Sequence, residues 1–413
     1  MAQLNITLNQ DEMLQLFTAD RGSAFAKLLE DSLNCFLKAE SAEQLNAGWY
    51  ERSEERTGSR NGYRDRPLTT RIGQITLKVP KHRNGESFKT LVFDNYCRSE
   101  SALILTMAEM CVNGVSTRKV SQVMETLCGK SFSKSTVSEA CKELDEKIKE
   151  FKDRPLTGEY PFVTIDATYF KVRENSRVIS KAFMIAYATN NDGHREIIGF
   201  GIYRNESKET WNDFLKGLKA RGLTGVRMIT SDAHEGIIDA ISKQFPDVPW
   251  QRCQFHFSRN ITQKTPPKYQ KGLASELQEM FNCKTIEAAR RRRDEIIADY
   301  KDIAEEAVTC LEDGFEEAMT VMVLPGYLRK YYRTSNQIER LNKELKRRSK
   351  VIGVFPNEGS LMRLMGAVLM EKNDQLALSR CVFKAATLQD MMATDIPSRL
   401  VKIAREQRQL LAA

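Results

Sequence analysis

The sequence has no long apolar run and no cysteine pattern that would organise a fold. No window comes near the roughly 18 consecutive apolar residues that a membrane span needs, and the start does not join a basic patch to an apolar stretch as an export signal would. The nine cysteines are scattered from Cys35 to Cys381 without a repeated close pair. This pattern excludes a readable disulfide framework or four-ligand zinc module. We therefore expect a soluble cytoplasmic protein with no membrane partner.

What the sequence does have is a surplus of basic residues. It contains 63 lysines and arginines against 55 aspartates and glutamates, which gives a net charge of +8 over 413 residues. Such a surplus favours a polyanionic partner, although it is also common on solvated surfaces. The length leaves room for about two or three domains with a sizeable core.

Residues 1–100 are predicted to form a helical segment followed by a small basic β module. Apolar side chains recur near helical spacing in the first half. The second half is basic and rich in turns, with Asn61 and Gly62 as a hairpin signal. From Ile75 to Val79 apolar and polar residues alternate, which is typical of a strand.

Residues 101–155 are predicted to be a DNA-binding region. Two short helices are expected around Cys128, Gly129 and Lys130, an arrangement that resembles a helix-turn-helix. Pro155 then marks a boundary, because the chain that follows has a different character.

Residues 156–259 are predicted to form the first part of an α/β core. Strands are expected near residues 160–172, 181–188, 196–203, 226–230 and 250–255, and helices near 208–220 and 236–244. This βββαβαβ order is typical of an RNase H-like core with a mixed five-stranded sheet, rather than of a doubly wound nucleotide fold. Residues 260–330 are helical and charged, so they are predicted as an all-helical insertion. Residues 331–413 then complete the core with further helices.

Two aspartates lie at the predicted strands. Asp166 lies within an apolar strand, where an unpaired carboxylate is costly to bury. It is either a metal ligand or an edge-strand residue that faces water. Asp232 closes a later strand and is followed by Glu235, and this Asp-x-x-Glu pattern by itself favours a helix cap. Open sheets also expose functional groups at strand ends, so both roles can coexist.

Glu339 is the third acid of interest. Asn336, three residues earlier, is a candidate helix cap with Glu339 as its reciprocal partner. Asn342, Lys343 and Lys346 follow at helical spacing, so one face carries a carboxylate together with amide and cationic donors suited to phosphate. A solvated charged face is the alternative.

Together the three acids predict a site for two divalent cations that prefer oxygen ligands. Mg²⁺ is the expected ion, with Mn²⁺ able to substitute. Two such ions about 3.5–4 Å apart activate an attacking water or 3′-hydroxyl and stabilise the leaving oxygen. The predicted chemistry is phosphodiester hydrolysis and transesterification.

Two further motifs have simple structural explanations. Cys253 and His256 have zinc-like spacing, but no second Cys/His pair is near enough to complete four ligands, so packing is favoured. The arginines at 290–293 are typical of a solvated helix face, with phosphate contact as the alternative.

Taken in order, the motifs resemble the mutator-type transposases of bacterial insertion sequences, a family of DDE enzymes. The motifs are RTGSRNGY at 56–63, VTIDAT at 163–168, ITSDAH at 229–234, CQFH at 253–256 and TSNQIERLN at 334–342, followed by Phe355 and Pro356. Each motif alone is weak, but the ordered set covers nearly the whole chain and is specific.

The resemblance implies a role for each motif. Asp166, Asp232 and Glu339 would be the catalytic acids and metal ligands, and Cys253 and His256 the structural Cys-x-x-His signature. The helical insertion would be the one that this family places before its final acid.

The resemblance also implies that the residues before the core bind the terminal inverted repeats of a mobile element. The start of the second helix of a helix-turn-helix usually meets base edges, and cations beside Glu339 would meet phosphates. The predicted DNA contacts are Lys134, Ser135, Thr136, Arg340, Lys343 and Lys346. A homodimer that pairs two element ends on the bacterial nucleoid is expected.

The resulting prediction is a DNA transposase that cleaves at the ends of an insertion sequence and joins them to target DNA. A domesticated sequence-specific DNA-binding protein is one alternative, against which the intact acids argue. An RNase H-like nuclease without strand transfer is another. Reaction products distinguish them, since a transposase joins ends whereas a nuclease only releases fragments.

Overall fold

The structure is a computed structural model that divides the chain into two compact units, Met1–Leu144 and Asp145–Ala413. The residues that it describes are 21–48, 51, 56–70, 73–84, 87–90, 107–108, 110–113, 115–128, 137, 141–142 and 144–412.

In the first unit a helix packs on a two-stranded sheet. Helix α2 (Arg21–Gln44) lies against the antiparallel strands β1 (Ser59–Thr70) and β2 (Gly73–Arg83). Their shared core contains Leu37 from the helix and Leu68, Ile75, Leu77 and Val79 from the strands. The predicted alternation in β2 is confirmed, because the apolar residues from Ile75 to Val79 are buried and those between them are exposed.

The hairpin predicted at Asn61 and Gly62 is wrong. Both residues lie inside β1, where the register with β2 shifts between Arg60 and Tyr63. Gly62 has a φ of +73°, a left-handed conformation that glycine adopts without strain and that β-bulges often use. The sequence signal therefore marks a bulge, and the two strands are joined only after Thr70.

The region predicted to form a helix-turn-helix is described only in part, and the motif itself stays a prediction. Helix α4 (Thr117–Cys128) buries Val120 and Met124 against Met107 and Val137. The predicted turn after Cys128 and the residues Lys134, Ser135 and Thr136 lie outside the described residues.

The second unit contains a five-stranded mixed sheet after helix α6 (Leu144–Asp153). In chain order its elements are β3 (Phe162–Glu174), β4 (Arg177–Thr189), β5 (Arg195–Tyr203), α7 (Lys208–Ala220), β6 (Met228–Ser231), α8 (Glu235–Gln244) and β7 (Trp250–Arg252). The strands lie in the order β5-β4-β3-β6-β7. Neighbours among β3, β4 and β5 are antiparallel, and β6 and β7 continue the sheet in parallel. The predicted βββαβαβ order and mixed α/β architecture are confirmed.

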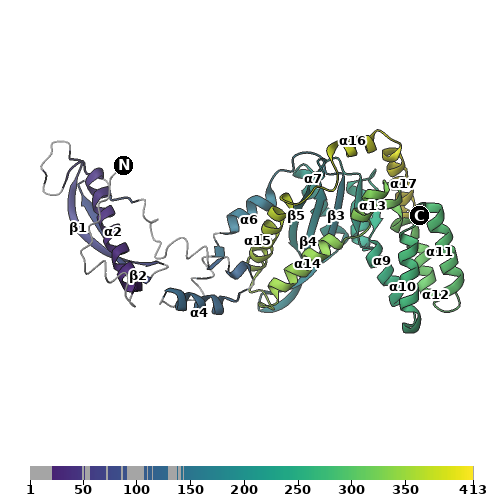
Figure 1. Ribbon diagram of the computed structural model, residues 1–413, viewed down its shortest axis with the longest axis horizontal. Helices are drawn as coiled ribbons and strands as arrows, with labels where there is room; N and C mark the ends of the chain where they lie inside the picture. Colours follow the sequence, from purple (N-terminus) through teal and green to yellow (C-terminus); the bar gives the residue numbers. More distant parts are fainter. Residues whose placement is uncertain are drawn as a thin grey trace. The chain divides into compact units, whose positions relative to one another are not determined.

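The two faces of the sheet are covered by different helices. Val163, Ile165 and Ile229 share a buried core with Trp211 of α7 and Ile237 of α8. Because side chains alternate along a strand, the residues between them face the other way. On that face lie α14 (Asn336–Ser349) and α15 (Glu358–Ala377); in Figure 1, α14 runs across the strands and α15 lies beside β5.

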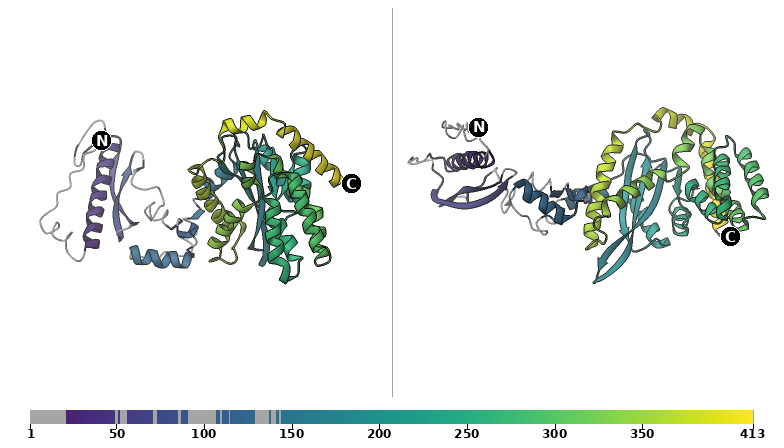
Figure 2. Two further views of the ribbon diagram at one scale, coloured as in Figure 1. Left: turned by 45° about the vertical axis from the view of Figure 1, so that its right-hand side comes forward. Right: turned by 60° about the horizontal axis from the view of Figure 1, so that its bottom comes forward.

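The chain between β7 and α14 is helical, as predicted for residues 260–330. Its elements are α9 (Gln254–Gln263), α10 (Pro267–Phe281), α11 (Ile286–Tyr300), α12 (Glu305–Ala318), the 3₁₀ helix η1 (Thr320–Val323) and α13 (Gly326–Tyr332). Helices α9 to α12 bury a core of their own around Phe257, Leu277 and Phe315. Figure 2 shows them as a group beside the sheet.

The last helices complete the second unit. Helix α15 packs through an apolar stripe, since Leu361, Leu364, Val368 and Leu369 are all buried. Two helices follow, α16 (Ala385–Met392) and α17 (Ile396–Ala412). Among the helices of the described residues, none is long and apolar enough to cross a membrane.

Candidate active site

Asp166 and Asp232 lie on adjacent strands and on the same face of the sheet. Strands β3 and β6 pair in parallel, with Phe162 opposite Met228 and Thr164 opposite Thr230. Continued by two residues, this register brings Asp166 opposite Asp232, just past the end of β6. The alternation of side chains turns both acids away from α7 and α8. Since β3 is the central strand, the edge-strand alternative for Asp166 is wrong.

Asp166 is a buried carboxylate with a specific partner. The side-chain amide of Asn342 in α14 donates a hydrogen bond of 2.8 Å to its Oδ2. Burial and, after it, the negative charge of Asp232 together raise the pKa of Asp166 to about 7, although the field of His256 opposes both. The protein therefore holds this acid where ionisation is unfavourable unless a positive charge comes near.

Asp232 does not cap the helix that follows it. The N-cap of α8 is His234, whose Nδ1 accepts a hydrogen bond of 3.1 Å from the amide of Gly236. The capping interpretation of Asp232 is therefore wrong, and His234, to which the sequence assigned no role, has the cap. The Oδ1 atom of Asp232 is buried and has no hydrogen-bond partner among the described residues.

Glu339 is brought to the sheet by the segment that precedes α14. The Thr230 hydroxyl donates a hydrogen bond of 2.9 Å to the backbone carbonyl of Tyr332, and the backbone amide of Gln254 donates one of 3.0 Å to the backbone carbonyl of Arg333. These bonds join the end of β6 and the start of α9 to a segment far along the chain. Glu339 then lies in the first turn of α14, one turn before Asn342.

The predicted cap of α14 is also wrong. The N-cap is Ser335 rather than Asn336, and no side chain makes the capping hydrogen bond. The Ser335 hydroxyl instead lies 3.3 Å from Glu339 Oε1, to which it donates. Glu339 is thus free of a capping role, and its carboxylate is held by a side-chain donor.

Cys253 and His256 lie at the start of α9. The strand predicted to reach residue 255 ends at Arg252, so Cys253 directly precedes the helix and His256 lies in its first turn. His256 Nε2 is 3.6 Å from Glu339 Oε1. The Cys253 sulfur accepts a hydrogen bond of 3.3 Å from the backbone amide of Ser335. The Ser335 hydroxyl lies 3.2 Å from the same sulfur, so its single proton can serve either this sulfur or Glu339 Oε1.

The ligand atoms of Cys253, His256 and Glu339 all lie within 4.8 Å of one another, and among the described residues this is the group of three that could hold a metal ion. The Cys253 side chain raises the pKa of His256 to about 9, although burial opposes this, and the charges of Glu339 and Asp166 contribute. Burial raises the pKa of the Cys253 thiol, but contacts with His256 and Ser335 outweigh it and lower the pKa. Packing alone is therefore an incomplete account of this pair.

The structure thus brings the predicted acids into one region without joining them in one ligand group. Asp166 and Asp232 are neighbours on the sheet, whereas Glu339 lies with Cys253 and His256.

A fourth acid, Glu206, was not predicted. It lies just before α7, and its pKa is raised by burial and, after that, by the charge of Asp232. The charge of Glu206 in turn raises the pKa of Asp166. Its sequence surroundings contain no signal for such a place.

The predicted cations of α14 are exposed. Arg340, Lys343 and Lys346 all face solvent in the second unit. Arg340 also lines a cavity of about 340 Å³ together with Arg195 and Lys372. Of the three predicted cations, Arg340 is therefore the one that lines this cavity, whose lining also includes Glu344.

The arginine run at 290–293 is largely occupied by ion pairs. Arg290 makes two hydrogen bonds to Glu316, at 3.0 and 2.9 Å. Arg292 contacts Glu276, Glu279 and Glu295. The helix-face interpretation is favoured over phosphate contact, because these arginines are paired with acids of their own region.

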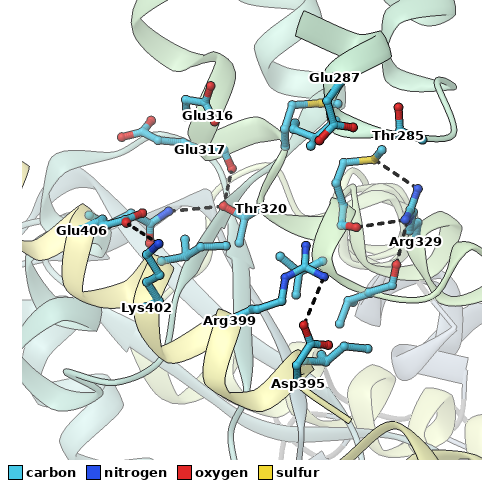
Figure 3. A pocket seen from close by; sticks show the side chains of 18 of the residues that line it. Thr285, Glu287, Glu316, Glu317, Thr320, Arg329, Asp395, Arg399, Lys402 and Glu406 are labelled. Atoms are coloured by element: carbon cyan, nitrogen blue, oxygen red, sulfur yellow. Dashed lines mark hydrogen bonds and ion pairs between the residues drawn. The ribbon is translucent and has the colours of Figure 1, made fainter.

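A large cavity of the second unit lies apart from the candidate site. It has a volume of about 900 Å³ and lies between α11, α12, η1 and α17. Figure 3 shows Arg329 donating to neighbouring carbonyls and Arg399 facing Asp395 inside it. Its lining includes neither Asp166, Asp232 nor Glu339.

Comparison with known proteins identifies the family of this chain. The sequence matches the description of the transposases of the Mutator family over residues 2–379. The chain therefore belongs to the Mutator family of transposases, and by that membership it is a DNA transposase.

Individual relatives carry insertion-sequence names. The chain is 43% identical over 379 residues to the transposase for insertion sequence element IS256 in transposon Tn4001 of Staphylococcus aureus, covering 91% of this chain and 97% of the relative. It is 39% identical to the transposase for ISRM5 of Rhizobium meliloti, covering 82% and 85%. A solved Drosophila P element transposase strand transfer complex matches 77% of this chain and 85% of its own, at 12% identity and a TM-score of 0.30. That score is too low to support an argument about the fold.

Proposed function

We propose that this transposase cleaves DNA at the ends of an insertion sequence and transfers the strands with Asp166, Asp232 and Glu339 as its catalytic acids. The observation that carries the proposal is the adjacency of Asp166 and Asp232 on the central strands. The burial and neighbouring charge that raise the pKa of Asp166 to about 7 are an arrangement that a bound cation would relieve.

The side chains around these acids fit a divalent cation. Buried acceptor oxygens without a hydrogen-bond partner among the described residues include Asp232 Oδ1, Asn342 Oδ1 and Thr168 Oγ1. Unsatisfied buried polar atoms are rare in native proteins and often mark a missing ligand. Oxygen donors are those that Mg²⁺ prefers, and Mn²⁺ accepts the same set.

Asp166, Asp232 and Glu339 would hold two Mg²⁺ ions, which would activate the attacking water or 3′-hydroxyl and stabilise the leaving oxygen. Asn342 orients the Asp166 carboxylate through its hydrogen bond. Glu339 would turn from His256 toward the two aspartates. Arg340, Lys343 and Lys346 would hold the DNA phosphates beside the reacting bond, since positive side chains carry most of the affinity for a phosphate backbone.

We further propose a modular architecture around this site. The modules are residues 1–100 as a helical and basic β module, 101–155 as a helix-turn-helix-like DNA-binding region, 156–259 as an RNase H-like core, 260–330 as its helical insertion and 331–413 as its completion. Lys134, Ser135 and Thr136 would contact bases of the terminal inverted repeats. A homodimer would pair two element ends on the nucleoid of a bacterium.

The test is an assay of the full chain with Mg²⁺ and labelled DNA that carries the element ends. We expect cleaved and joined products from the natural protein and none from Glu339→Gln, with DNA binding retained in both. Released fragments without joining would favour a nuclease. Binding without any metal-dependent product would favour a domesticated DNA-binding protein.

A further inference from the structure

We propose that Cys253, His256 and Glu339 form a binding site for a soft divalent cation such as Zn²⁺, and that occupancy of this site keeps Glu339 away from the Mg²⁺ site. The sequence argues against zinc because Cys253 and His256 have no second pair nearby. The structure supplies the third ligand from α14, since Glu339 lies 83 residues after His256 in the sequence.

The geometry of the group suits a small tetrahedral ion. Its three ligand atoms lie within 4.8 Å of one another, and the 3.6 Å between His256 Nε2 and Glu339 Oε1 is close to the nitrogen–oxygen separation around zinc. Zinc bonds of about 2.0–2.3 Å to sulfur, nitrogen and oxygen place tetrahedral ligands roughly 3.3–3.8 Å apart. Three protein ligands with an open fourth position are the usual form of a non-structural zinc site.

The donor types separate this site from that of Mg²⁺. A thiolate sulfur and an imidazole nitrogen are soft or borderline ligands that select zinc, whereas Mg²⁺ takes oxygen ligands. The backbone amide of Ser335 already donates to the Cys253 sulfur, and the Ser335 hydroxyl lies within hydrogen-bond distance of both this sulfur and Glu339 Oε1. Hydrogen bonds of this kind orient ligands and stabilise a metal-bound thiolate.

Glu339 is therefore shared by two sites of different chemistry. In the structure its carboxylate lies with Ser335 and His256 rather than with the aspartates. A zinc ion bound there would fix it in that place, and the Mg²⁺ site would lose one of its three acids. This consequence rests on the proposed function, whereas the metal site itself does not.

The site is tested by titrating the full metal-free chain with Co²⁺, a spectroscopic substitute for zinc. We expect a thiolate-to-cobalt charge-transfer absorption that is absent in Cys253→Ser. Added Zn²⁺ should displace the bound Co²⁺ and remove the absorption, whereas added Mg²⁺ should not. His256→Gln and Glu339→Gln should keep the absorption and weaken the Co²⁺ affinity by at least about tenfold, since each removes one ligand. Cys381→Ser, at an exposed cysteine, is the matched control and should change nothing.

An absorption that persists in Cys253→Ser would overturn the site, as would an affinity that Glu339→Gln and His256→Gln leave unchanged. These two variants keep the test decisive if the serine variant does not fold. In the DNA assay, Zn²⁺ at the concentration that fills the site should suppress Mg²⁺-dependent cleavage by the natural protein. In His256→Gln the same zinc concentration should suppress cleavage less, when each protein's rate is compared with its own rate without zinc. Full occupancy without suppression would overturn the inhibitory role. The cobalt titration tests the metal site without any DNA cleavage, whereas the DNA assay tests the proposed function. Failure of one proposal can therefore be distinguished from failure of the other.

Discussion

The charged side chains of the helical region between β7 and α14 are paired with opposite charges, whereas those of the sheet site include two acids side by side. In α11 and α12, Arg290 is paired with Glu316 through two hydrogen bonds, and Arg292 has three carboxylates around it. At the sheet, Asp166 and Asp232 are adjacent acids, and Asp232 Oδ1 is buried with no partner among the described residues.

The difference separates charges that neighbouring side chains of opposite sign neutralise from two acids that lie beside each other. Ion pairs on a helical surface neutralise each other and contribute little, typically about 0–1 kcal/mol each. Buried like charges oppose folding, and proteins keep them mainly where function requires a perturbed pKa. The contrast therefore directs attention to the sheet even though the arginine run is the more conspicuous feature of the sequence.

The largest expected effect is on catalysis. Asp232→Asn should lower the rate of Mg²⁺-dependent strand cleavage by at least about 10³-fold, because a metal ligand worth several kcal/mol of charge stabilisation is lost. Glu316→Gln, which removes a paired carboxylate of the helical region, should leave the rate within about twofold. Cleavage of labelled element ends measures both, and equal effects of the two variants would remove the distinction drawn between the regions.

The next effect is on stability and has a defined pH dependence. The ordinary pKa of Asp166, 3.8, is raised by burial and by Asp232 to about 7. The folded protein therefore retains a proton that the unfolded chain releases, so the free energy of unfolding falls as pH rises from about 4 to 7. Without metal, Asp166→Asn should be the more stable protein at pH 8, by on the order of 2–4 kcal/mol.

Urea denaturation in the presence of a chelator, at pH 8 and again near pH 4, measures this difference. The advantage of the variant should shrink toward the lower pH, and Mg²⁺ should stabilise the natural protein more than the variant. Asp302→Asn, at an exposed aspartate, should be neutral throughout. A variant that is less stable at pH 8 would show that Asp166 is compensated by the protein itself.

A smaller effect is expected from the partner of Asp166. Asn342→Ala removes the hydrogen bond of 2.8 Å to the carboxylate and should lower kcat about tenfold, because a hydrogen bond to a charged group is worth about 1.5–3 kcal/mol. Asn336→Ala, at an exposed asparagine of the same helix, is the matched control. Equal rates for the two variants would mean that Asn342 does not orient the site.

The smallest effects compare the two groups of cations. Lys343→Gln should reduce the salt dependence of DNA binding by about one unit of slope, as expected for one phosphate contact. Arg290→Gln should leave that slope unchanged and alter stability by less than about 0.5 kcal/mol, because its ion pair is exposed. If Arg290→Gln changed the salt dependence of DNA binding, the arginine run would be part of the DNA-binding surface.

Most of the fold of the second unit could be predicted from local pattern. Helix α7 has the bounds expected, and the strands and α8 differ from the expected ranges by a few residues, since apolar periodicity reports directly on burial. Predictions from local signals failed where the same short pattern occurs in more than one kind of local structure. Asn61 and Gly62 form a bulge instead of a hairpin, and Asp232 leaves the cap to His234.

The candidate site was predictable only residue by residue. Each acid could be selected from its motif, but the distances among them depend on strand register and on the hydrogen bonds of Thr230 and Gln254 to the segment before α14. The contact of Glu339 with His256 has no signal in either motif, because it joins residues from different parts of the chain. Glu206 had no signal at all.

The sequence by itself determined the order of elements and the family and selected the three candidate acids, because periodicity and short motifs are local properties of the chain. Only the tertiary structure decided which acids are neighbours and which charges are neutralised. It placed Asp166 beside Asp232 and Glu339 beside Cys253 and His256. The reason is physical: the pKa of an acid and its capacity to bind a metal depend on distances and burial, which exist only after distant segments have packed together.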